Sequence, residues 1–143
     1  MAISVYMNFP GNAKEVMNYY KDVFGTTEPE IMYFKDMPPS DHMVVTPEME
    51  NMVMHGSIQF KENWIMFSDV PPGSPQELKM GNNLTMMINS ESFDELKGYF
   101  DKLVTEGQVI MPYEKTFWSS GYGMVLDKFG ITWQFNCDEE PAE

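Results

Sequence analysis

The chain has few cysteines and few basic residues, and each shortage excludes a class of function. Cys137 is the one cysteine among 143 residues, so no internal disulfide can form, which is typical of a reducing cytoplasm. Nine basic residues stand against twenty-two acidic ones, giving a formal charge of −13. A surface with this charge repels phosphate backbones and anionic lipids. We therefore expect no nucleic-acid partner and no membrane partner.

Long hydrophobic runs and a signal peptide are also absent. No apolar run approaches the ~20 residues that span a bilayer. The N-terminal "MAISVYMNF" lacks a basic start and a small-residue cleavage site. We expect a cytoplasmic protein. Its 43% hydrophobic and 14% aromatic residues are enough for the core of one domain.

Common catalytic motifs are missing as well. The sequence has no Gly-x-Ser-x-Gly elbow, no glycine-rich phosphate loop and no Gly-x-Gly-x-x-Gly after a strand. Cys137 is followed directly by acidic residues and has no basic neighbour in the sequence, so we do not interpret it as a nucleophile. The sequence leaves open whether the protein is an enzyme.

One pattern of elements occurs twice. Residues 12–24, "NAKEVMNYYKDVF", and residues 92–104, "SFDELKGYFDKLV", both repeat apolar side chains at the spacing of one helix face. Asn12 is the expected N-cap of the first helix, and a capping box beginning at Ser92 opens the second. Glycines at 25 and 107 are the expected stops.

Each predicted helix follows one strand and precedes three. Both halves also close alike, on a tryptophan followed five residues later by an aspartate. A strand, a helix and three strands, twice over, predict a duplicated α+β fold. The predicted strands are 3–9, 30–34, 54–60 and 63–69 in the first half, and 84–89, 108–114, 121–127 and 131–137 in the second.

The remaining segments set the boundaries. We predict a single domain over 1–143, with module one at 1–70, a linker at 71–82, module two at 83–138 and a frayed acidic tail at 139–143. Residues 35–51 are polar and rich in proline, and are predicted to form a long irregular loop.

Five segments of the chain resemble the vicinal oxygen chelate superfamily, which includes glyoxalase I, bleomycin-resistance proteins and extradiol dioxygenases. They are "YMNFPGNAKEVMNYYKDVFG", "FKDMPP", "MHGSIQF", "WIMFSD" and "GMVLDKFGITWQFN". The closest likeness is to the PhnB-like branch, and it runs from the first predicted strand to the last. The resemblance implies two tandem βαβββ modules whose strands form a curled, barrel-like sheet around a cavity, with the helices outside. It also implies a homodimer.

The resemblance does not by itself imply an activity, because one fold carries many functions. Some PhnB-like relatives carry the label 3-demethylubiquinone-9 3-methyltransferase. The sequence does not support methyl transfer, since it has no glycine-rich strand-to-helix turn for an adenosyl cofactor.

Metal-dependent members of the superfamily hold a divalent ion with His, Glu or Gln on the first and last strands of each module. The positions that the resemblance assigns to these ligands offer no imidazole and no carboxylate, which such ions prefer. We therefore expect no metal and no cofactor. The carried-over positions are Val5, Met66, Asn83 or Thr85, and Gln134.

A relocated metal site is the alternative. His55 with Glu62 or Glu114 is the combination that would support a metal-dependent lyase, isomerase or dioxygenase-type enzyme. A single histidine at a strand end is more often structural, and His42 lies in the polar loop.

The favoured interpretation is a protein that binds a small apolar or aromatic molecule in the cavity. If Val5, Met66 and Gln134 point inward, strand alternation adds their second neighbours. Two alternatives remain: these residues only pack the interior of the barrel, or the protein is an inert or structural one that binds no ligand. The candidate ligand-binding residues are Val5, Met7, Phe9, Trp64, Met66, Ser68, Thr85, Trp118, Thr132, Gln134 and Asn136.

Overall fold

The computed structural model describes residues 1–38 and 43–138, so the expectations for His42 and for the tail at 139–143 lie outside the described residues. The chain divides into two compact units, Met1–Lys79 and Met80–Glu143, called module one and module two below. The division falls inside the predicted linker. The assignment of the whole chain to a single domain stays a prediction.

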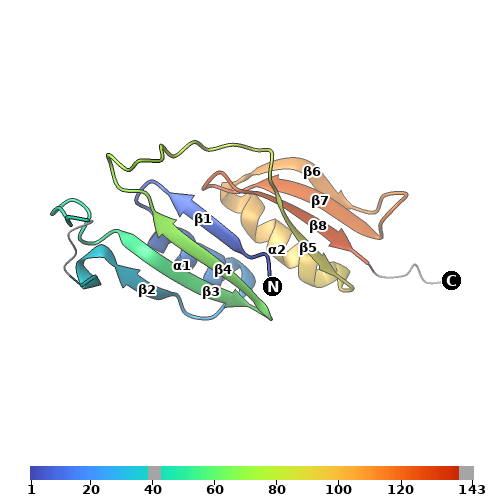
Figure 1. Cartoon of the computed structure of the whole chain (residues 1–143). Helices are drawn as coiled ribbons and strands as arrows, with labels where there is room; N and C mark the ends of the chain where they lie inside the picture. The colour runs from blue at the N-terminus through green and yellow to red at the C-terminus, as the bar shows by residue number, and fades with distance from the viewer. Residues whose placement is uncertain (39–42, 139–143) are drawn as a thin grey trace. The chain divides into compact units, whose positions relative to one another are not determined.

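Module one is a mixed four-stranded sheet with one helix (Figure 1). The strands lie in the order β1-β4-β3-β2, with β1 parallel to β4 and the other neighbours antiparallel. The elements are β1 (Val5–Phe9), α1 (Ala13–Phe24), β2 (Glu30–Tyr33), the 3-10 turn η1 (Phe34–Asp36), β3 (Val53–Phe60) and β4 (Asn63–Asp69).

Module two repeats this topology. Its strand order is β5-β8-β7-β6, with β5 parallel to β8. The prediction of two tandem βαβββ modules is thereby confirmed, and each sheet is open rather than closed into a barrel. The elements are β5 (Met86–Ser90), α2 (Phe93–Glu106), β6 (Gln108–Glu114), β7 (Gly121–Leu126) and β8 (Thr132–Cys137).

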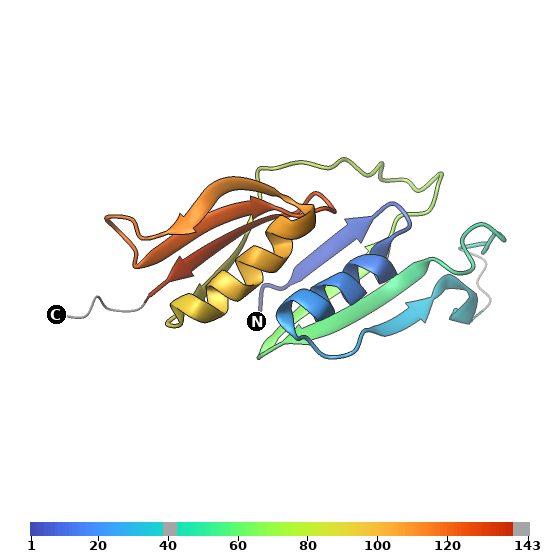
Figure 2. The same ribbon diagram turned by 180° about the vertical axis from the view of Figure 1, so that it is seen from behind.

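Each helix covers one face of its own sheet, as Figure 2 shows, and the core of the module lies between them. In module one, Tyr20 of α1 packs on Phe67 of β4, with ring centroids 6.2 Å apart. In module two, Phe100 of α2 meets Phe135 of β8 edge to face at 6.1 Å. The opposite side of each sheet, called its open face here, is covered by no helix of that module.

The N-terminus of α1 is capped from a distance, which corrects the expectation for Asn12. The Asn12 side chain makes no capping hydrogen bond. Instead the buried Asp69 carboxylate, at the end of β4, accepts N–H groups from Gly11 at 3.1 Å and Ala13 at 2.9 Å. Its second oxygen accepts from Val53 at 2.8 Å. The helix therefore starts correctly only when β4 is in place.

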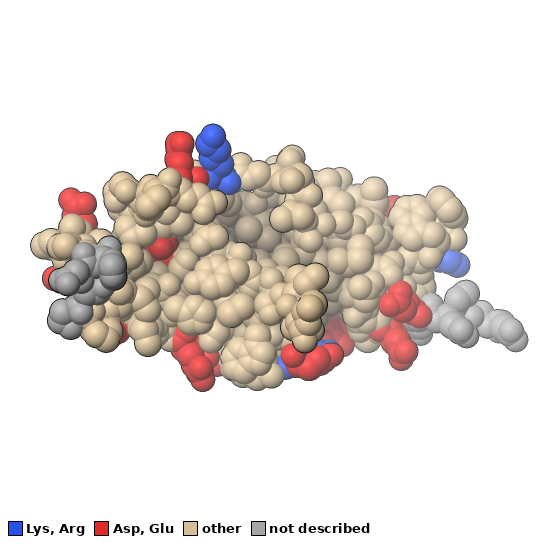
Figure 3. Space-filling view, viewed as in Figure 1, with Lys and Arg blue, Asp and Glu red and all other residues tan. Residues whose placement is uncertain are grey.

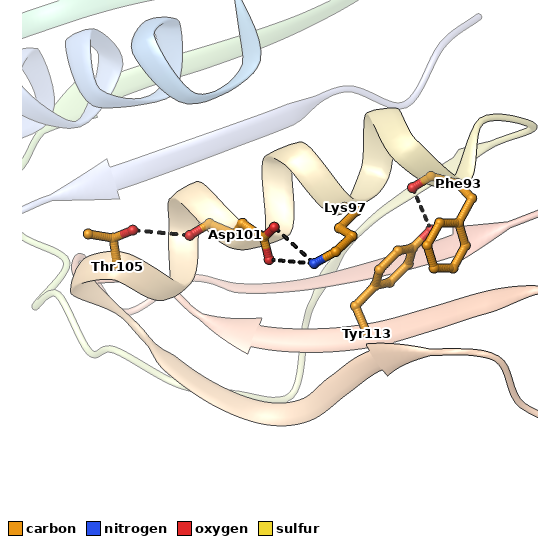
Figure 4. A network of polar contacts seen from close by, with 5 residues as sticks. All are labelled: Phe93, Lys97, Asp101, Thr105 and Tyr113. Carbon is orange, nitrogen blue, oxygen red and sulfur yellow. Dashed lines mark hydrogen bonds and ion pairs between the residues drawn. The ribbon is translucent and has the colours of Figure 1, made fainter.

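The N-terminus of α2 is capped locally, as the sequence predicts. The Ser92 hydroxyl accepts the Glu95 N–H at 3.2 Å. Figure 4 shows two further contacts that fix this helix: Lys97 pairs with Asp101 one turn on, and the Tyr113 hydroxyl of β6 donates to the Phe93 carbonyl at 3.1 Å.

The two tryptophans that seemed equivalent in the sequence lie on opposite faces. Trp133 is buried on the helix side, where its indole N–H donates to Asp127 at 2.9 Å. Trp64 is 48% exposed on the open face of module one. The pairing with the parallel neighbour strand shows that Met66, opposite Tyr6, corresponds to Gln134, opposite Met87. Trp64 and Trp133 therefore do not occupy equivalent positions: when Met66 is aligned with Gln134, the two tryptophans are one residue apart.

Residues 35–38 and 43–52 are largely irregular, as predicted, but they are not wholly exposed. Met49, within this segment, is buried, and its N–H donates to the Thr46 carbonyl at 3.1 Å. None of the helices formed by residues 1–38 and 43–138 is long and apolar enough to cross a membrane.

Candidate functional site

Strand β1 shows which of the sequence-predicted residues reach an open face. Met7 and Phe9 are 7% and 1% exposed, because they fill the core under α1, and alternation puts Val5 on the same side. The expectation that these three residues point away from the helix was therefore wrong, because they lie on the helix-covered face. Tyr6 and Asn8 occupy the open face instead.

The open face of module one carries the other three candidates of that module. Met66 and Ser68 are Cα partners of Tyr6 and Asn8, and Trp64 lies on the same side of β4. The Ser68 hydroxyl donates to Asn8 Oδ1 at 3.0 Å. The Tyr6 hydroxyl lies 3.3 Å from His55 Nδ1.

The open face of module two presents Gln134 at its centre. The Tyr122 hydroxyl donates to Gln134 Oε1 at 2.5 Å, and Gln134 Nε2 donates to Thr85 Oγ1 at 2.7 Å. These two contacts fix which end of the amide points to which neighbour. Among residues 80–138, the Thr85 hydroxyl has no acceptor of its own, so its proton is available to a ligand.

A polar row crosses the sheet beside Gln134. The register places the Cα atoms of Glu114, Tyr122, Asn136 and Asn89 opposite one another on four successive strands. Neighbouring strands are ~4.8 Å apart, so these side chains are in contact range. Asn136 Nδ2 donates to Asn89 Oδ1 at 3.2 Å and to Asp138 Oδ1 at 2.7 Å.

A row of methionines adjoins the polar row. Met111, Met124 and Met87 are in register with Gln134 across the four strands. Met87 and Met111 are exposed. Thioether side chains are flexible and polarisable, and they pack well against aromatic rings. Thr132, another candidate, lies at the start of β8 and is buried.

Trp118 stands at one end of this face, in the hairpin between β6 and β7. Its ring meets Tyr122 at 5.5 Å with an angle of 63°, and Phe117 at 4.8 Å with an angle of 81°. Trp118 is 54% exposed. An aromatic wall thus adjoins both the methionines and the polar row.

The structure brings together Thr85, Trp118, Gln134 and Asn136 on module two, while Trp64, Met66 and Ser68 share the open face of module one. The binding role of these residues stays a prediction. Sequence reasoning missed Tyr122 and Met124, and it considered Glu114 only as a ligand of a relocated metal site. The alternation in 121–126 shows which residues share a face, but only the register with β8 shows that Tyr122 reaches Gln134.

The open faces do not fit a divalent metal. Within the described parts of the chain, no three His, Cys, Asp or Glu side chains gather as a metal site would require. His55 lies inside β3, whereas Glu62 follows the far end of that strand; at ~3.3 Å per residue, about 16 Å of strand separates them. Tyr6, Met66 and Met87 offer no carboxylate or imidazole where a hard or borderline cation needs one. The expected absence of a metal stays a prediction.

A cavity of about 680 Å³ lies against the segment that follows β4 in module one. It contains none of the sequence-predicted site residues, and its buried carboxylate, Asp69, is already occupied by three backbone N–H groups. The lining residues are Asn8, Asp69, Val70, Pro71, Ser74, Pro75, Gln76, Glu77, Leu78 and Lys79.

Two βαβββ modules, each with one helix-covered and one open sheet face, define the fold of the vicinal oxygen chelate superfamily. A solved glyoxalase/bleomycin resistance protein/dioxygenase family enzyme from Burkholderia phytofirmans shares this fold, with a TM-score of 0.60 at 12% identity over 95% of this chain and 98% of that one. The chain belongs to the family described as 3-demethylubiquinone-9 3-methyltransferase, whose model it matches over residues 1–136.

Three proteins of high coverage support this membership. Protein YjdN of Escherichia coli is 30% identical, with both chains covered in full. The structure of PA1353 from Pseudomonas aeruginosa is 31% identical, with a TM-score of 0.79 over 98% of this chain and 99% of that one. A PhnB protein from Bacillus cereus, described as a putative 3-demethylubiquinone-9 3-methyltransferase, has a TM-score of 0.71 at 22% identity, over 96% and 99% of the two chains.

The residues present do not fit an adenosyl cofactor, which a methyltransferase would use. Such a cofactor binds at a glycine-rich strand-to-helix turn. In module one that turn donates its Gly11 and Ala13 N–H groups to Asp69. In module two the corresponding turn is capped by Ser92. The turn of module two contains no glycine and that of module one contains only Gly11, so neither is the glycine-rich turn that such a cofactor needs.

Proposed function

We propose that this protein binds a small planar or apolar molecule on the open face of module two, without a metal. The observation that carries the proposal is the Gln134 amide, held between Tyr122 and Thr85 on a face that no helix of its module covers. An amide fixed at both ends presents a defined hydrogen-bonding pattern, which is what a ligand site needs for orientation.

The side chains around Gln134 support an apolar ligand. Met87 and Met124 are its Cα partners on the two neighbouring strands, and Trp118 closes one end. Thioether and aromatic walls with a few neutral hydrogen-bonding groups are typical of pockets for planar molecules. The Thr85 hydroxyl supplies a donor for a ligand oxygen or nitrogen.

N-phenyl-1-naphthylamine, a neutral probe whose fluorescence rises in apolar surroundings, tests the proposal. We expect saturable enhancement with the native protein. Gln134→Ala should weaken binding roughly 3–10-fold, the value of one hydrogen-bonding group. Its unfolding midpoint in urea should stay nearly unchanged, because Gln134 contributes little to the core.

Asn18→Ala is the matched control, since Asn18 is an exposed amide side chain on α1 and lies on neither open face. It should bind the probe as the native protein does. Absence of any saturable enhancement, or equal binding by native protein and Gln134→Ala, would overturn the proposal.

Three features of the wider assignment remain predictions: the cavity implied by the resemblance, a homodimer and a cytoplasmic location. Size-exclusion chromatography tests the second, because a single species at the 16.6 kDa of one chain would contradict a dimer. No contact among the described residues favours the alternative of a metal-dependent enzyme.

A further inference from the structure

We propose that the hairpin between β6 and β7 binds a methylated ammonium group, so that the ligand of module two is an organic cation. Phe117, Trp118 and Tyr122 form a corner of three rings: successive ring planes meet at 81° and 63°, with centroids 4.8 Å and 5.5 Å apart. The faces of aromatic rings attract quaternary ammonium groups, and this corner offers several such faces to solvent.

The hairpin holds these rings in place through its own hydrogen bonds. The Thr116 N–H donates to the Ser119 carbonyl at 3.0 Å, and the Ser119 N–H donates back to Thr116 Oγ1 at 3.1 Å. The Ser119 hydroxyl is also within 3.0 Å of the Cys137 carbonyl of β8. The loop is thus tied to the sheet, although Phe117 is 97% exposed.

Two carboxylates and one lysine, Lys115, lie beside the aromatic corner, and this balance favours a cation. Glu114 is the Cα partner of Tyr122, and its side chain is exposed; no lysine among residues 80–138 pairs with it. Asp138 lies at the same end of the face, bonded to Asn136. No lysine of the described chain lies over the rings of the corner.

The charge balance of the whole protein agrees with a cationic ligand. Acidic side chains outnumber basic ones on the face seen in Figure 3, in keeping with the formal charge of −13. An acidic surface attracts cations and repels anions over about one Debye length, ~8–10 Å at moderate salt.

A methylated ammonium fits this corner better than a primary one. Ring faces accept no strong hydrogen bond, so an ammonium with several N–H groups would lose its bonds to water there without replacement. Methyl groups carry the positive charge to the ring faces and have no such bonds to lose. The attraction of a cation to an aromatic face is worth roughly a two- to fivefold gain in affinity per exposed site, and more when water is excluded.

This inference rests on the proposed function, because the corner adjoins the face around Gln134. Phenyltrimethylammonium and tert-butylbenzene, which have nearly the same shape and differ in charge, are the probes. Each is titrated while the indole N–H signal of Trp118 is followed by ¹H–¹⁵N NMR, with the signal assigned from Trp118→Phe. We expect the cation to shift this signal and to bind at least about fivefold more tightly than the neutral isostere.

Two substitutions at Trp118 separate ring electrostatics from simple packing and from general attraction to an acidic surface. Trp118→Phe keeps an aromatic face and should retain most of the preference for the cation. Trp118→Leu keeps an apolar side chain and should lose it. Both variants lack the Trp118 indole, so binding to them is followed through the backbone amide signals of residues 116–122. Glu114→Gln should reduce the preference, whereas Glu91→Gln, an exposed glutamate between β5 and α2, should not. Because Trp118 and Glu114 are exposed, these variants should fold, which their urea midpoints can verify.

The outcomes separate the two proposals. If N-phenyl-1-naphthylamine fails to bind the native protein, the proposed function is overturned. If that probe binds but phenyltrimethylammonium and tert-butylbenzene bind equally, only the cation site is overturned. A preference for the cation that survives in Trp118→Leu would also overturn it, since the rings would then have no part in selection.

Discussion

Modules one and two share one topology but carry different chemistry at matching positions. The centre of the last strand is Met66 in one module and Gln134 in the other, and both face away from the helix. The helix-facing neighbours, Phe67 and Phe135, are the same residue type and equally buried. The helix-covered face is therefore set by packing, while the open face was free to diverge, and that is where a function can lie.

The modules also differ in how the end of the last strand is used. Asp69 is opposite Phe9 in module one, and Cys137 is opposite Ser90 in module two. The aspartate joins β4 to the start of α1 and to β3. The cysteine is a buried apolar side chain. Module one therefore depends on a long-range polar contact that module two replaces with the local cap at Ser92.

The largest effect is expected from Asp69→Ala. It leaves three backbone N–H groups, including the buried contacts from Ala13 and Val53, without their acceptor. We expect the free energy of unfolding to fall by about 3–5 kcal/mol, because each unsatisfied buried group costs about 1–3 kcal/mol. Urea unfolding measures this. Cys137→Ala, at the matching position, should cost only about 1 kcal/mol; an equal loss would refute the contrast.

The next largest effect is expected from substituting two glycines at matching positions. Gly56 lies opposite Phe67, and Gly123 lies opposite Phe135. A Cβ on Gly123 would come within 2.7 Å of the Tyr113 Cα, which is backbone and cannot easily move. A Cβ on Gly56 would meet the flexible end of Met17 at 2.6 Å. We expect Gly123→Ala to cost about 2–3 kcal/mol and Gly56→Ala clearly less, since overpacking typically costs about 1–3 kcal/mol. Urea unfolding measures both losses. A larger loss for Gly56→Ala would contradict this order, because it would mean that the backbone of β6 moves aside more easily than the Met17 side chain.

A smaller effect is expected at the helix caps. Ser92→Ala removes the acceptor of the Glu95 N–H and should cost about 1 kcal/mol. Asn12→Ala, at the matching position of α1, should cost little, because the Asn12 side chain makes no capping bond. Thermal unfolding of the two variants compares them. A larger loss for Asn12→Ala would mean that Asp69 does not act as the cap of α1.

The smallest effect concerns Tyr99 and appears only at high pH. Partial burial and the Glu95 carboxylate, which accepts its hydroxyl at 2.7 Å, raise the pKa of Tyr99 above the ordinary value of 10.0. The unfolded chain then releases this proton first, so the stabilisation is complete below pH 10 and is lost as pH rises above it. Tyr99→Phe should lose less stability than the native protein between pH 10 and 11. Parallel slopes of unfolding free energy against pH would contradict this.

The spacing of apolar and polar residues along the chain was enough to predict the helices and strands. The apolar spacing in 12–24 and 92–104 predicted both helices, and strands β3, β4, β6 and β8 begin and end within a residue of the expected positions. The cap at Ser92 was also predictable, because donor and acceptor lie three residues apart. The cap of α1 was not, because its acceptor, Asp69, is more than fifty residues away from Gly11.

The candidate site was predicted only in part. Gln134 and Asn136 were assigned to the open face because alternation along β8 is regular. In β1 the inward position of Val5 was carried over from the resemblance, and alternation then placed Met7 and Phe9 on the same, wrong face. Packing under α1 decided which face these residues occupy.

The sequence by itself determined the order and kind of the elements, the repeat of one βαβββ unit, and a family whose members share that fold, because each depends on spacing along the chain. Tertiary structure alone decided which residues meet across strands. Tyr122 reaches Gln134, Glu114 aligns with Tyr122, and Asp69 caps α1 only after the sheets acquire their register. Register follows from the burial of the helix-covered face as a whole, since a slip of one residue would expose every core side chain of a strand.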